Sequence, residues 1–535
     1  MKSNQLYLRK LLLSLIILIP NLIQCSDSKN KRGHIGETTL PVCETQGEPR
    51  EVQAPILVRT YPASWDENWF GSPAFADLDG DGQNEIIAGR HSVLYVWSVD
   101  GNLLWRAPMG QDASSLDDHA SARQYAAPAI GDFDNDGTLE IATAYSHFIA
   151  VYKHDGSFAP GWPASFPNAE HEIRSVAAAD LDRDGYWEIA AVKTSNGPVT
   201  VVFDYQGRVL EGWPQVDCEN CYDHGGYNQN IGLADITGDG NLEVIATYDC
   251  AYIGFFKHNG EALAAHPDLR GDVIPSVPMF HDWALQVQGW GPDGADRDEF
   301  TDSPPVFGDI DGDGHLEIIL YSDHERAGEY KNRGNCLWVL KTDLSRVPGF
   351  EWPICSGDPL FEGYENNIVQ VAPVPAVANI QGDSRPEIIV PSYDGLMRAY
   401  SPDGEELWAV EFDSPKGAFI GASGAVVADL NGDGRPEVMF STYAMDEGRS
   451  HLYIVSANGT VLHKIALEKR GSMSPPTIGD VDGDGQLDLL ISLKDTVGGG
   501  LGGVQLWTIP NAGTSCILWS TGRGNMARTG TSWNP

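Results

Sequence analysis

Basic residues are scarce in this sequence of 535 residues, where 35 lysines and arginines stand against 75 aspartates and glutamates. The formal charge of −40 repels nucleic acid and anionic lipid, so we expect no nucleic-acid partner. Long hydrophobic runs are scarce as well, because no apolar segment after residue 23 is long enough to span a membrane. The acidic surplus therefore calls for another explanation, and cations are the simplest one.

Helical and enzymatic signals are also missing. No stretch has the pattern of a long amphipathic helix. No nucleophile elbow, phosphate loop, dinucleotide fingerprint or zinc-protease helix is present. We therefore favour a binding protein over an enzyme and assign no catalytic residue.

The first 25 residues have the pattern of an export signal. Three basic residues precede the apolar run 11–23, which is too short for a transmembrane helix. The run ends near Cys25, which resembles the lipidated cysteine of bacterial lipoproteins, although Gln24 departs from the small residue found there in that family. We expect residues 1–25 to be a signal peptide and residues 26–50 a polar linker. The protein would then be exported to the bacterial outer membrane, periplasm or cell surface, with an ordinary secretory signal as the alternative to lipidation.

One acidic pattern recurs eight times along the rest of the chain. Its first copy reads Asp-Leu-Asp-Gly-Asp-Gly-Gln-Asn-Glu, and short apolar strands precede and follow each copy. Two further strands usually follow, joined by an Asp-Gly or Asn-Gly turn such as Asp100-Gly101. The copies begin at Asp77, Asp132, Asp180, Asp235, Asp309, Asn379, Asp429 and Asp480.

Each repeat therefore predicts four antiparallel strands, a unit too small to bury both faces of its sheet. Stacking such sheets radially around an axis buries them and leaves few open edges. We predict an all-β fold over residues 51–535, an eight-bladed β-propeller of four-stranded antiparallel blades. Seven blades with one displaced repeat, or a linear β-solenoid, are the alternatives.

The repeats resemble the FG-GAP repeats of integrin α-subunit propellers and their bacterial relatives. The resemblance rests on the acidic loop, on the Pro-small-apolar strand before it and on the Glu-apolar-apolar strand after it. It implies calcium-binding loops on one face of the propeller, and adhesion to or recognition of a ligand on the opposite face.

The acidic pattern suits Ca²⁺, a hard cation that takes about six to eight oxygen ligands. Positions one, three, five and nine of the loop supply side-chain oxygens, position seven supplies a backbone carbonyl, and glycine at position six allows the tight turn. We predict about seven Ca²⁺ ions as cofactors, one in every loop except the sixth. The candidate ligands are Asp77, Asp79, Asp81, Gln83 and Glu85; Asp132, Asp134, Asp136, Thr138 and Glu140; Asp180, Asp182, Asp184, Tyr186 and Glu188; Asp235, Thr237, Asp239, Asn241 and Glu243; Asp309, Asp311, Asp313, His315 and Glu317; Asp429, Asn431, Asp433, Arg435 and Glu437; and Asp480, Asp482, Asp484, Gln486 and Asp488.

The sixth copy departs from the pattern. It has Asn379 at position one and Gln381 at position three, and Ser384 replaces the glycine at position six. We expect this loop to bind a cation weakly or not at all. In the other loops, three or four like charges lie within a few ångströms, which is unfavourable without a cation.

Export to an oxidising compartment makes disulfides the expected state of the cysteines. Cys336 and Cys355 fall at the start of the third strand and the end of the fourth strand of one blade, so we predict that they pair. Cys43 with Cys516 would join the N-terminal segment to the last blade. Cys250 would pair with Cys221 or with its neighbour Cys218.

Five tyrosines end the second strands of their repeats. Second strands end on the face opposite the acidic loops, so we predict that these rings surround a ligand, stacking on sugars or gripping a protein loop. The alternative is that they only terminate strands. The candidate ligand-binding residues are Tyr145, Tyr248, Tyr321, Tyr393 and Tyr443.

Taken together, these features predict a secreted or surface-anchored calcium-binding β-propeller that binds a protein or glycan ligand. Membrane contact would come only from a lipid anchor. The alternative is a polysaccharide lyase of the rhamnogalacturonan-lyase type on the same propeller, because similar acidic loops decorate those enzymes.

Overall fold

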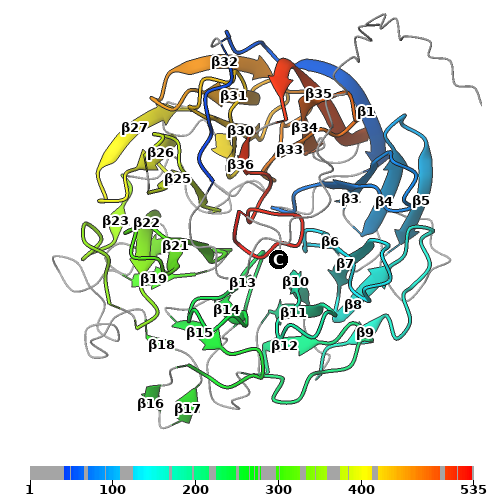
Figure 1. The fold of residues 1–535 in the computed structure, drawn as a ribbon, viewed down its shortest axis with the longest axis vertical. Coiled ribbons are helices and arrows are strands. Elements are labelled where there is room, and N and C mark those ends of the chain that lie inside the picture. Colours follow the sequence, from blue (N-terminus) through cyan, green and yellow to red (C-terminus); the bar gives the residue numbers. More distant parts are fainter. Residues whose placement is uncertain are drawn as a thin grey trace, which may run out of the picture.

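Eight small β-sheets stand around a common axis, as Figure 1 shows in a view along the shortest dimension of the molecule. In this computed structural model the described residues are 41–47, 50–64, 70–90, 92–108, 124–167, 172–194, 198–215, 225–248, 252–263, 266–269, 272–274, 277–278, 297–300, 302–325, 333–343, 345–357, 374–383, 385–412, 420–494, 501–514 and 516–532. Within them all regular structure is β-strand, and no helix is long and apolar enough to cross a membrane.

The sheets are antiparallel and form the eight-bladed β-propeller that the repeats predict, so the predicted fold is confirmed. The first four blades are β2 (Ala74–Ala76), β3 (Glu85–Arg90), β4 (Val93–Ser98) and β5 (Leu103–Pro108); β6 (Ala129–Gly131), β7 (Glu140–Tyr145), β8 (Phe148–Tyr152) and β9 (Ala164–Ser165); β10 (Ile173–Ala179), β11 (Glu188–Lys193) and β12 (Thr200–Phe203); and β13 (Ile231–Ala234), β14 (Glu243–Thr247), β15 (Tyr252–Phe256) and β18 (Val277–Pro278). A separate hairpin of β16 (His266–Leu269) and β17 (Asp272–Ile274) precedes β18.

Blades 5 and 7 carry extra strands beside the basic set of four, whereas blade 6 has the basic set alone. Blade 5 has β20 (Val306–Gly308), β21 (Glu317–Glu325), β22 (Arg333–Leu340) and β23 (Ile354–Cys355), with β19 (Arg297–Glu299) beside β21. Blade 6 has β24 (Ala376–Ala378), β25 (Glu387–Pro391), β26 (Leu396–Tyr400) and β27 (Glu406–Glu411). Blade 7 has β29 (Val426–Ala428), β30 (Glu437–Ala444), β31 (His451–Val455) and β32 (Val461–Ala466), with β28 (Ile420–Ala422) on β30 and β36 (Ile517–Trp519) on β29.

The eighth blade is built from both ends of the chain. It contains β33 (Thr477–Gly479), β34 (Gln486–Leu493) and β35 (Leu501–Gly513), and its outermost strand is β1 (Ile56–Ser64), which pairs antiparallel with β35. The backbone hydrogen bonds between β1 and β35 therefore close the ring. The radial arrangement leaves only short, protected sheet edges.

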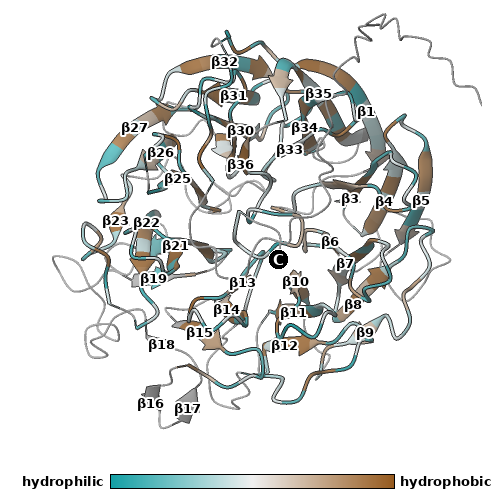
Figure 2. Cartoon of the chain, viewed as in Figure 1, coloured by the Kyte–Doolittle hydropathy of each residue, from teal (hydrophilic) through white to brown (hydrophobic). Residues whose placement is uncertain are grey.

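The hydrophobic core lies between neighbouring blades, and Figure 2 shows the strands as the main hydrophobic segments of the chain. Successive sheets share clusters of buried side chains, as when Val151 of β8 packs in the same cluster as Ala191 of β11. Small residues let the backbones of successive inner strands approach each other near the axis: Ala177, Ala178 and Ala179 of β10 are fully buried. Each blade is thus stable only against its neighbours.

Tryptophans near the outer edge join one blade to the next. The indole N–H of Trp162 donates to the Tyr205 carbonyl at 2.9 Å, and that of Trp213 donates to the His258 carbonyl at 3.0 Å. Gly161 precedes the first of these tryptophans with a φ of 92°, and a Cβ there would lie 2.0 Å from the Gln206 carbonyl oxygen. Only glycine fits this close approach of two blades.

The C-terminal residues 516–532, which we name the central segment, run through the middle of the ring (Figure 1). Backbone N–H groups at the inner strands of six blades donate to carbonyls of this segment at 2.8–3.0 Å. The pairs are Asp429 to Cys516, Ile478 to Ser520, Ile130 to Met526, Ala178 to Ala527, Leu233 to Thr529 and Phe307 to Gly530. The segment therefore bonds to the inner edges of blades 7, 8 and 2 to 5, and it lies in the middle of the ring.

Two buried arginines of the central segment tie blades together. Arg523 donates to the carbonyls of Val176 at 2.7 Å and Ile231 at 2.9 Å, which belong to blades 3 and 4. Arg528, which is fully buried, donates to carbonyls just before the inner strands of blades 1 and 2. Burial lowers the pKa of Arg528 to about 9. Carbonyl dipoles compensate part of the desolvation of these guanidinium groups.

Replacing Arg528 by methionine is expected to lower the free energy of unfolding by about 3 kcal/mol, because several buried carbonyls lose their only charged donor. Arg208→Met, which removes an arginine whose side chain is 70% exposed, is the matched control and should change it by less than about 0.5 kcal/mol. Denaturant unfolding measures both. Equal stability of the two variants would show that the central segment does not support the ring.

Candidate metal sites in the acidic loops

The eight acidic loops all connect the first strand of a blade to its second strand. The loop of blade 1, for example, lies between β2 and β3, whose residues Ala76 and Glu85 pair across the two strands. Since the blades have the same antiparallel order, all eight loops lie on one face, which we name the acidic-loop face. The residues that precede the inner strands lie on the other side, which we name the opposite face.

One hydrogen bond recurs in every loop. A carboxylate oxygen of the acid at position nine accepts the backbone N–H of position two at 2.7–3.1 Å. In blade 1 this bond joins Glu85 to Leu78. The acid begins the second strand, so the bond fixes the loop to the blade and leaves its other oxygen for a further partner.

The acids at positions one and five fold the loop over themselves. One oxygen of the position-one aspartate accepts the N–H of the position-six glycine at 2.8–3.1 Å in seven loops. The position-five aspartate accepts the N–H of position seven at 2.8–2.9 Å in all eight loops. The carboxylates are thus oriented before any ion arrives, as a rigid metal site requires.

Position four of the loop has a left-handed backbone conformation. Glycine occupies it in six loops, but Asn135 and Arg183 occupy it in blades 2 and 3 with φ of 56° and 65°. Asparagine tolerates this region better than most residues, whereas arginine is strained there. The same loop geometry is therefore kept even where the side chain opposes it.

The loops bring their carboxylates close enough to share a cation. Positions one, three and nine lie within 4.8 Å of one another in blades 1, 3 and 5, and positions one, three and five do so in blade 2. Oδ1 of Asp77, of Asp180 and of Asp480 is buried and has no hydrogen-bond partner. A buried carboxylate oxygen without a donor is unfavourable unless a cation neutralises it. Several of these clusters can therefore bind metal ions.

The acids at position nine have pKa values above the usual range of a carboxyl group. Burial, with repulsion from the other carboxylates of the same loop, raises the pKa of Glu188 to about 8 and that of Glu140 to about 7. The same causes raise the pKa of Glu437 to about 8. A bound divalent cation would favour the ionised form and reverse this shift.

The loop of blade 6 satisfies its own polar groups. The Asn379 side-chain amide donates to the Asp383 carbonyl, and its oxygen accepts the N–H of Gly382 at 2.7 Å. Gln381 turns away and donates to the Ala457 carbonyl of the next blade at 3.0 Å. In this loop an amide N–H therefore takes the role that a cation has beside carboxylates. Ser384 lies outside the described residues.

The loop of blade 5 contains a cation from its own blade. The ammonium nitrogen of Lys341 lies 2.5 Å from Asp311 Oδ2 and 2.6 Å from Asp313 Oδ2. These two hydrogen bonds raise the pKa of Lys341. The sequence pattern gave no sign of this lysine because it follows β22, far along the chain from the loop. It competes with any metal ion for positions three and five.

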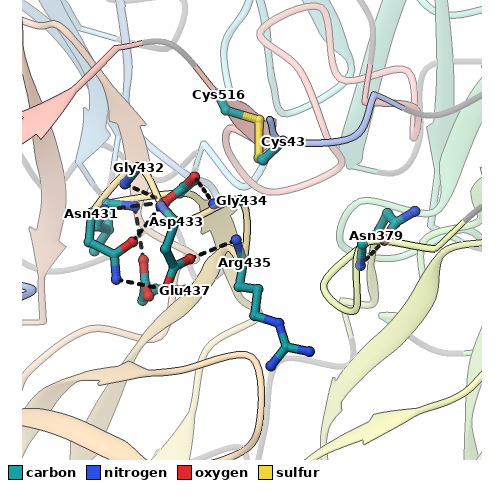
Figure 3. Close-up of a disulfide and its surroundings, with 12 residues drawn as sticks. Cys43, Asn379, Asn431, Gly432, Asp433, Gly434, Arg435, Glu437 and Cys516 are labelled. Atoms are coloured by element: carbon teal, nitrogen blue, oxygen red, sulfur yellow. Dashed lines mark hydrogen bonds between the residues drawn. A yellow bond between two sulfur atoms is a disulfide. The ribbon is translucent and has the colours of Figure 1, made fainter. Parts of the chain in front are cut away.

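The N-terminal segment contacts the loop of blade 7, and Figure 3 shows this loop beside the Cys43–Cys516 disulfide. The N–H of Gln46 donates to the Gly432 carbonyl at 2.7 Å, and the Thr45 hydroxyl donates to the Asp433 carbonyl at 3.1 Å. The disulfide Cys43–Cys516 holds this cover in place. Part of the segment expected to be a linker therefore packs on the propeller. Asn431 at position three donates its amide to Asp433 Oδ2 at 3.2 Å.

Two disulfides join described cysteines, Cys43–Cys516 and Cys336–Cys355, and both match the pairs expected from the sequence. Cys336 and Cys355 face each other across β22 and β23. Cys218, Cys221, Cys250 and Cys25 lie outside the described residues, so the pairing of Cys250 and the lipidation of Cys25 stay predictions.

The expectation that five tyrosines line a ligand surface is wrong, because their rings are buried between blades. Tyr248 and Tyr443 are fully buried, and Tyr321, Tyr145 and Tyr393 expose at most 6% of their surface. The Tyr248 hydroxyl, for instance, forms a 3.0 Å hydrogen bond with Thr200 Oγ1. Of the five, only Tyr145 is the last residue of its strand; Tyr321 and Tyr443 lie within β21 and β30, and Tyr248 and Tyr393 follow β14 and β25.

The fold and the loops define a class: an eight-bladed β-propeller with acidic loops suited to metal ions on one face. The family model for the FG-GAP-like repeat matches residues 77–143 and 132–191, which contain the first three acidic loops. Residues 77–191 are therefore FG-GAP-like repeats, as the resemblance implied, and they lie within an eight-bladed β-propeller. None of the curated proteins compared with the chain matches it.

Three solved structures that resemble the chain are remote from it in sequence. Sqt1 of Saccharomyces cerevisiae is 8% identical with a TM-score of 0.48, over 85% of this chain and 100% of that chain. The Dos1 propeller is 11% identical with a TM-score of 0.45, over 84% and 96%. The quinohemoprotein alcohol dehydrogenase from Comamonas testosteroni is 12% identical with a TM-score of 0.37, over 89% and 78%. Similarities this remote give no information about the function of the chain.

Asp182→Ala in blade 3 is expected to remove one bound Ca²⁺, because position three loses its carboxylate. The lost stabilisation in millimolar Ca²⁺ is about 0.4–1.4 kcal/mol for a site with a Kd of about 10⁻⁴ to 10⁻³ M. Gln381→Ala, at the same position in blade 6, is the control and should leave the calcium content unchanged. Elemental analysis after gel filtration measures the calcium content of both variants. An equal loss of calcium in both would contradict the assignment of the blade 3 loop as a calcium site.

Lys341→Met is expected to strengthen Ca²⁺ binding to the loop of blade 5 about tenfold, because the competing ammonium is gone. Lys464→Met, on the outer strand β32, is the control and should leave every site unchanged. Calorimetric titration of the metal-free protein measures both. An unchanged affinity in Lys341→Met would show that the lysine leaves the loop without cost when calcium binds.

Proposed function

We propose that the protein is an exported, calcium-binding propeller that recognises a protein or glycan ligand through its opposite face. One observation carries the calcium assignment: buried, unpaired oxygens of Asp77, Asp180 and Asp480 recur at the same position of three loops. Oxygen-only donor sets of this density suit Ca²⁺ better than softer-ligand metals. The membership of residues 77–191 in the FG-GAP-like repeat family supports the same assignment.

The loops are expected to differ in whether, how tightly and how fast they bind the ion. About seven Ca²⁺ ions fit the chain, one in each loop except that of blade 6. Blade 5 would bind most weakly because Lys341 competes with the ion. Blade 7 would exchange most slowly because the N-terminal segment covers its loop. The role of calcium is structural, since it neutralises carboxylates that the fold holds together.

The expected ligand surface is the opposite face of the ring. The central segment is bonded to the inner strands of six blades, so we expect a ligand to meet a face of the ring. The acidic-loop face is occupied by its own ions. The opposite face, with the connections between blades, is then the surface for a protein or carbohydrate partner.

Cys25→Ala is expected to release the protein from the membrane fraction of a bacterial host, because the thiol that would carry the lipid is gone. The wild-type chain, expressed in parallel, should fractionate with membranes. Identical fractionation of the two would contradict the lipoprotein anchor and leave an ordinary secretory signal.

The purified protein is expected to bind a member of an array of oligosaccharides and extracellular-matrix proteins in the presence of Ca²⁺, and to lose binding in a chelator. The same preparation is incubated with uronate-containing plant polysaccharides, where a lyase would produce new ultraviolet absorbance from unsaturated ends. Such absorbance would replace recognition by the lyase alternative. No binding and no absorbance would contradict both functions.

A further inference from the structure

Blade 5 has longer strands than the repeat requires. Its second strand β21 has nine residues and its third strand β22 has eight, whereas blades 1 to 4 have five or six residues in the second strand and four to six in the third. The added strand β19 pairs with the extended end of β21, where Asp298 lies opposite His324 (Figure 1). Second strands run away from the acidic loops, so this extension lies on the opposite face. It therefore adds side chains that the blade itself does not need.

The extension holds a buried network of polar side chains. Asp298 Oδ1 lies 3.3 Å from His324 Nδ1 and accepts the Ser322 hydroxyl at 2.5 Å. The Trp338 indole N–H donates to Ser322 Oγ at 3.1 Å. The side chains of His324 and Asp298 are 3% and 0% exposed. A buried carboxylate this close to an imidazole orients it, so Asp298 holds the His324 ring in position.

This network ends at the disulfide Cys336–Cys355, which we name the blade 5 disulfide. A ring nitrogen of His324 and the two sulfur atoms lie within 4.8 Å of one another. Cys336 is fully buried, whereas Cys355 is exposed on β23, a strand of two residues at the edge of the sheet. A thiol from solvent can therefore attack the sulfur of Cys355, and the sulfur of Cys336 would leave beside the imidazole.

The disulfide Cys43–Cys516, which we name the reference disulfide, has no exposed cysteine. Cys43 is buried and Cys516 is half-buried. It joins the N-terminal segment to the central segment. Its rate of reduction therefore gives an internal standard for a structural disulfide in the same molecule.

We propose that the blade 5 disulfide is redox-active and oxidises dithiols by thiol–disulfide exchange. A proton-donating group beside a sulfur stabilises the thiolate that forms when the disulfide opens, and a more stable leaving thiolate speeds the exchange. His324 has this role, and Asp298 is a positioning residue because it acts through His324. The activity is independent of the proposed recognition function, although both belong to the opposite face.

The exchange proceeds in two displacements. A thiolate of the dithiol attacks Sγ of Cys355, the S–S bond breaks, and the leaving sulfur of Cys336 takes the proton of the His324 imidazolium. The second thiol of the dithiol then gives its proton to His324 and attacks the first sulfur of its own molecule, so that Cys355 leaves as a thiolate. Two electrons have passed from the dithiol, which is now a disulfide, to the two cysteines.

The test uses the full, oxidised chain in millimolar Ca²⁺, with dithiothreitol as the dithiol. Samples are quenched with an alkylating reagent at increasing times, and peptide mass mapping gives the rate at which each disulfide opens. Four proteins are compared: wild type, His324→Gln, Asp298→Asn and the matched control His154→Gln, which changes an exposed histidine of blade 2. Thermal unfolding of the oxidised forms checks that each variant is folded, and the two blade 5 variants test the same step independently.

In the wild type, the blade 5 disulfide is expected to open about tenfold faster than the reference disulfide. His324→Gln and Asp298→Asn should each slow its opening about tenfold, whereas His154→Gln should not change it. The reference disulfide should open at the same rate in all four proteins. A substitution that only loosened blade 5 would speed the opening, so slower opening distinguishes this chemistry from a structural role.

Two outcomes would overturn the proposal. One is a blade 5 disulfide that opens no faster than the reference disulfide in the wild type. The other is opening in the folded variants His324→Gln and Asp298→Asn that is as fast as in the wild type or faster.

Discussion

The hydrogen bond from the backbone N–H at position two to the carboxylate at position nine holds each blade in shape, and the rest of the structure depends on it. In blade 1 it joins Leu78 to Glu85, and an equivalent bond recurs in every blade. The bond requires a buried carboxylate at the start of the second strand. In every blade except blade 6, that carboxylate lies beside two or three others of its loop, so the bond that shapes the blade also creates the need for a cation.

Ring closure transmits this local constraint to the whole molecule. Blades are stable only against their neighbours, and the two chain ends complete the circle: β1 supplies the outer strand of blade 8, and the central segment supplies hydrogen bonds to six inner strands. The Cys43–Cys516 disulfide joins those two ends next to the loop of blade 7. A cation lost from one loop would therefore weaken an element that its neighbours need, and the effect would spread around the ring.

The repeat could be predicted from the sequence because its signals are local. Acid spacing, the glycine at position six and the flanking apolar strands are readable within nine residues, and they predicted eight blades and the position of every loop. The pairing of Cys336 with Cys355 followed from the same register.

Contacts between distant segments could not be predicted in this way. Lys341 in the loop of blade 5, the N-terminal cover over blade 7 and the central segment leave no periodic signal. The missing fourth strand after β35 was the one available sign that the N-terminus closes the ring. The tyrosines were misplaced for a related reason: a strand end at the face of one blade, as at Tyr248, is still covered by the next blade.

The central claim is that the carboxylates held together by the fold need Ca²⁺, and thermal unfolding with and without a chelator tests it most directly. If each of about seven sites contributes about 0.4–1.4 kcal/mol in millimolar Ca²⁺, their sum is several kcal/mol, comparable to the whole stability of a typical domain. The account predicts a melting temperature that falls markedly in chelator and is restored by added Ca²⁺ in a single cooperative transition. The same melting temperature in both conditions, with no calcium bound to the purified protein, would contradict it.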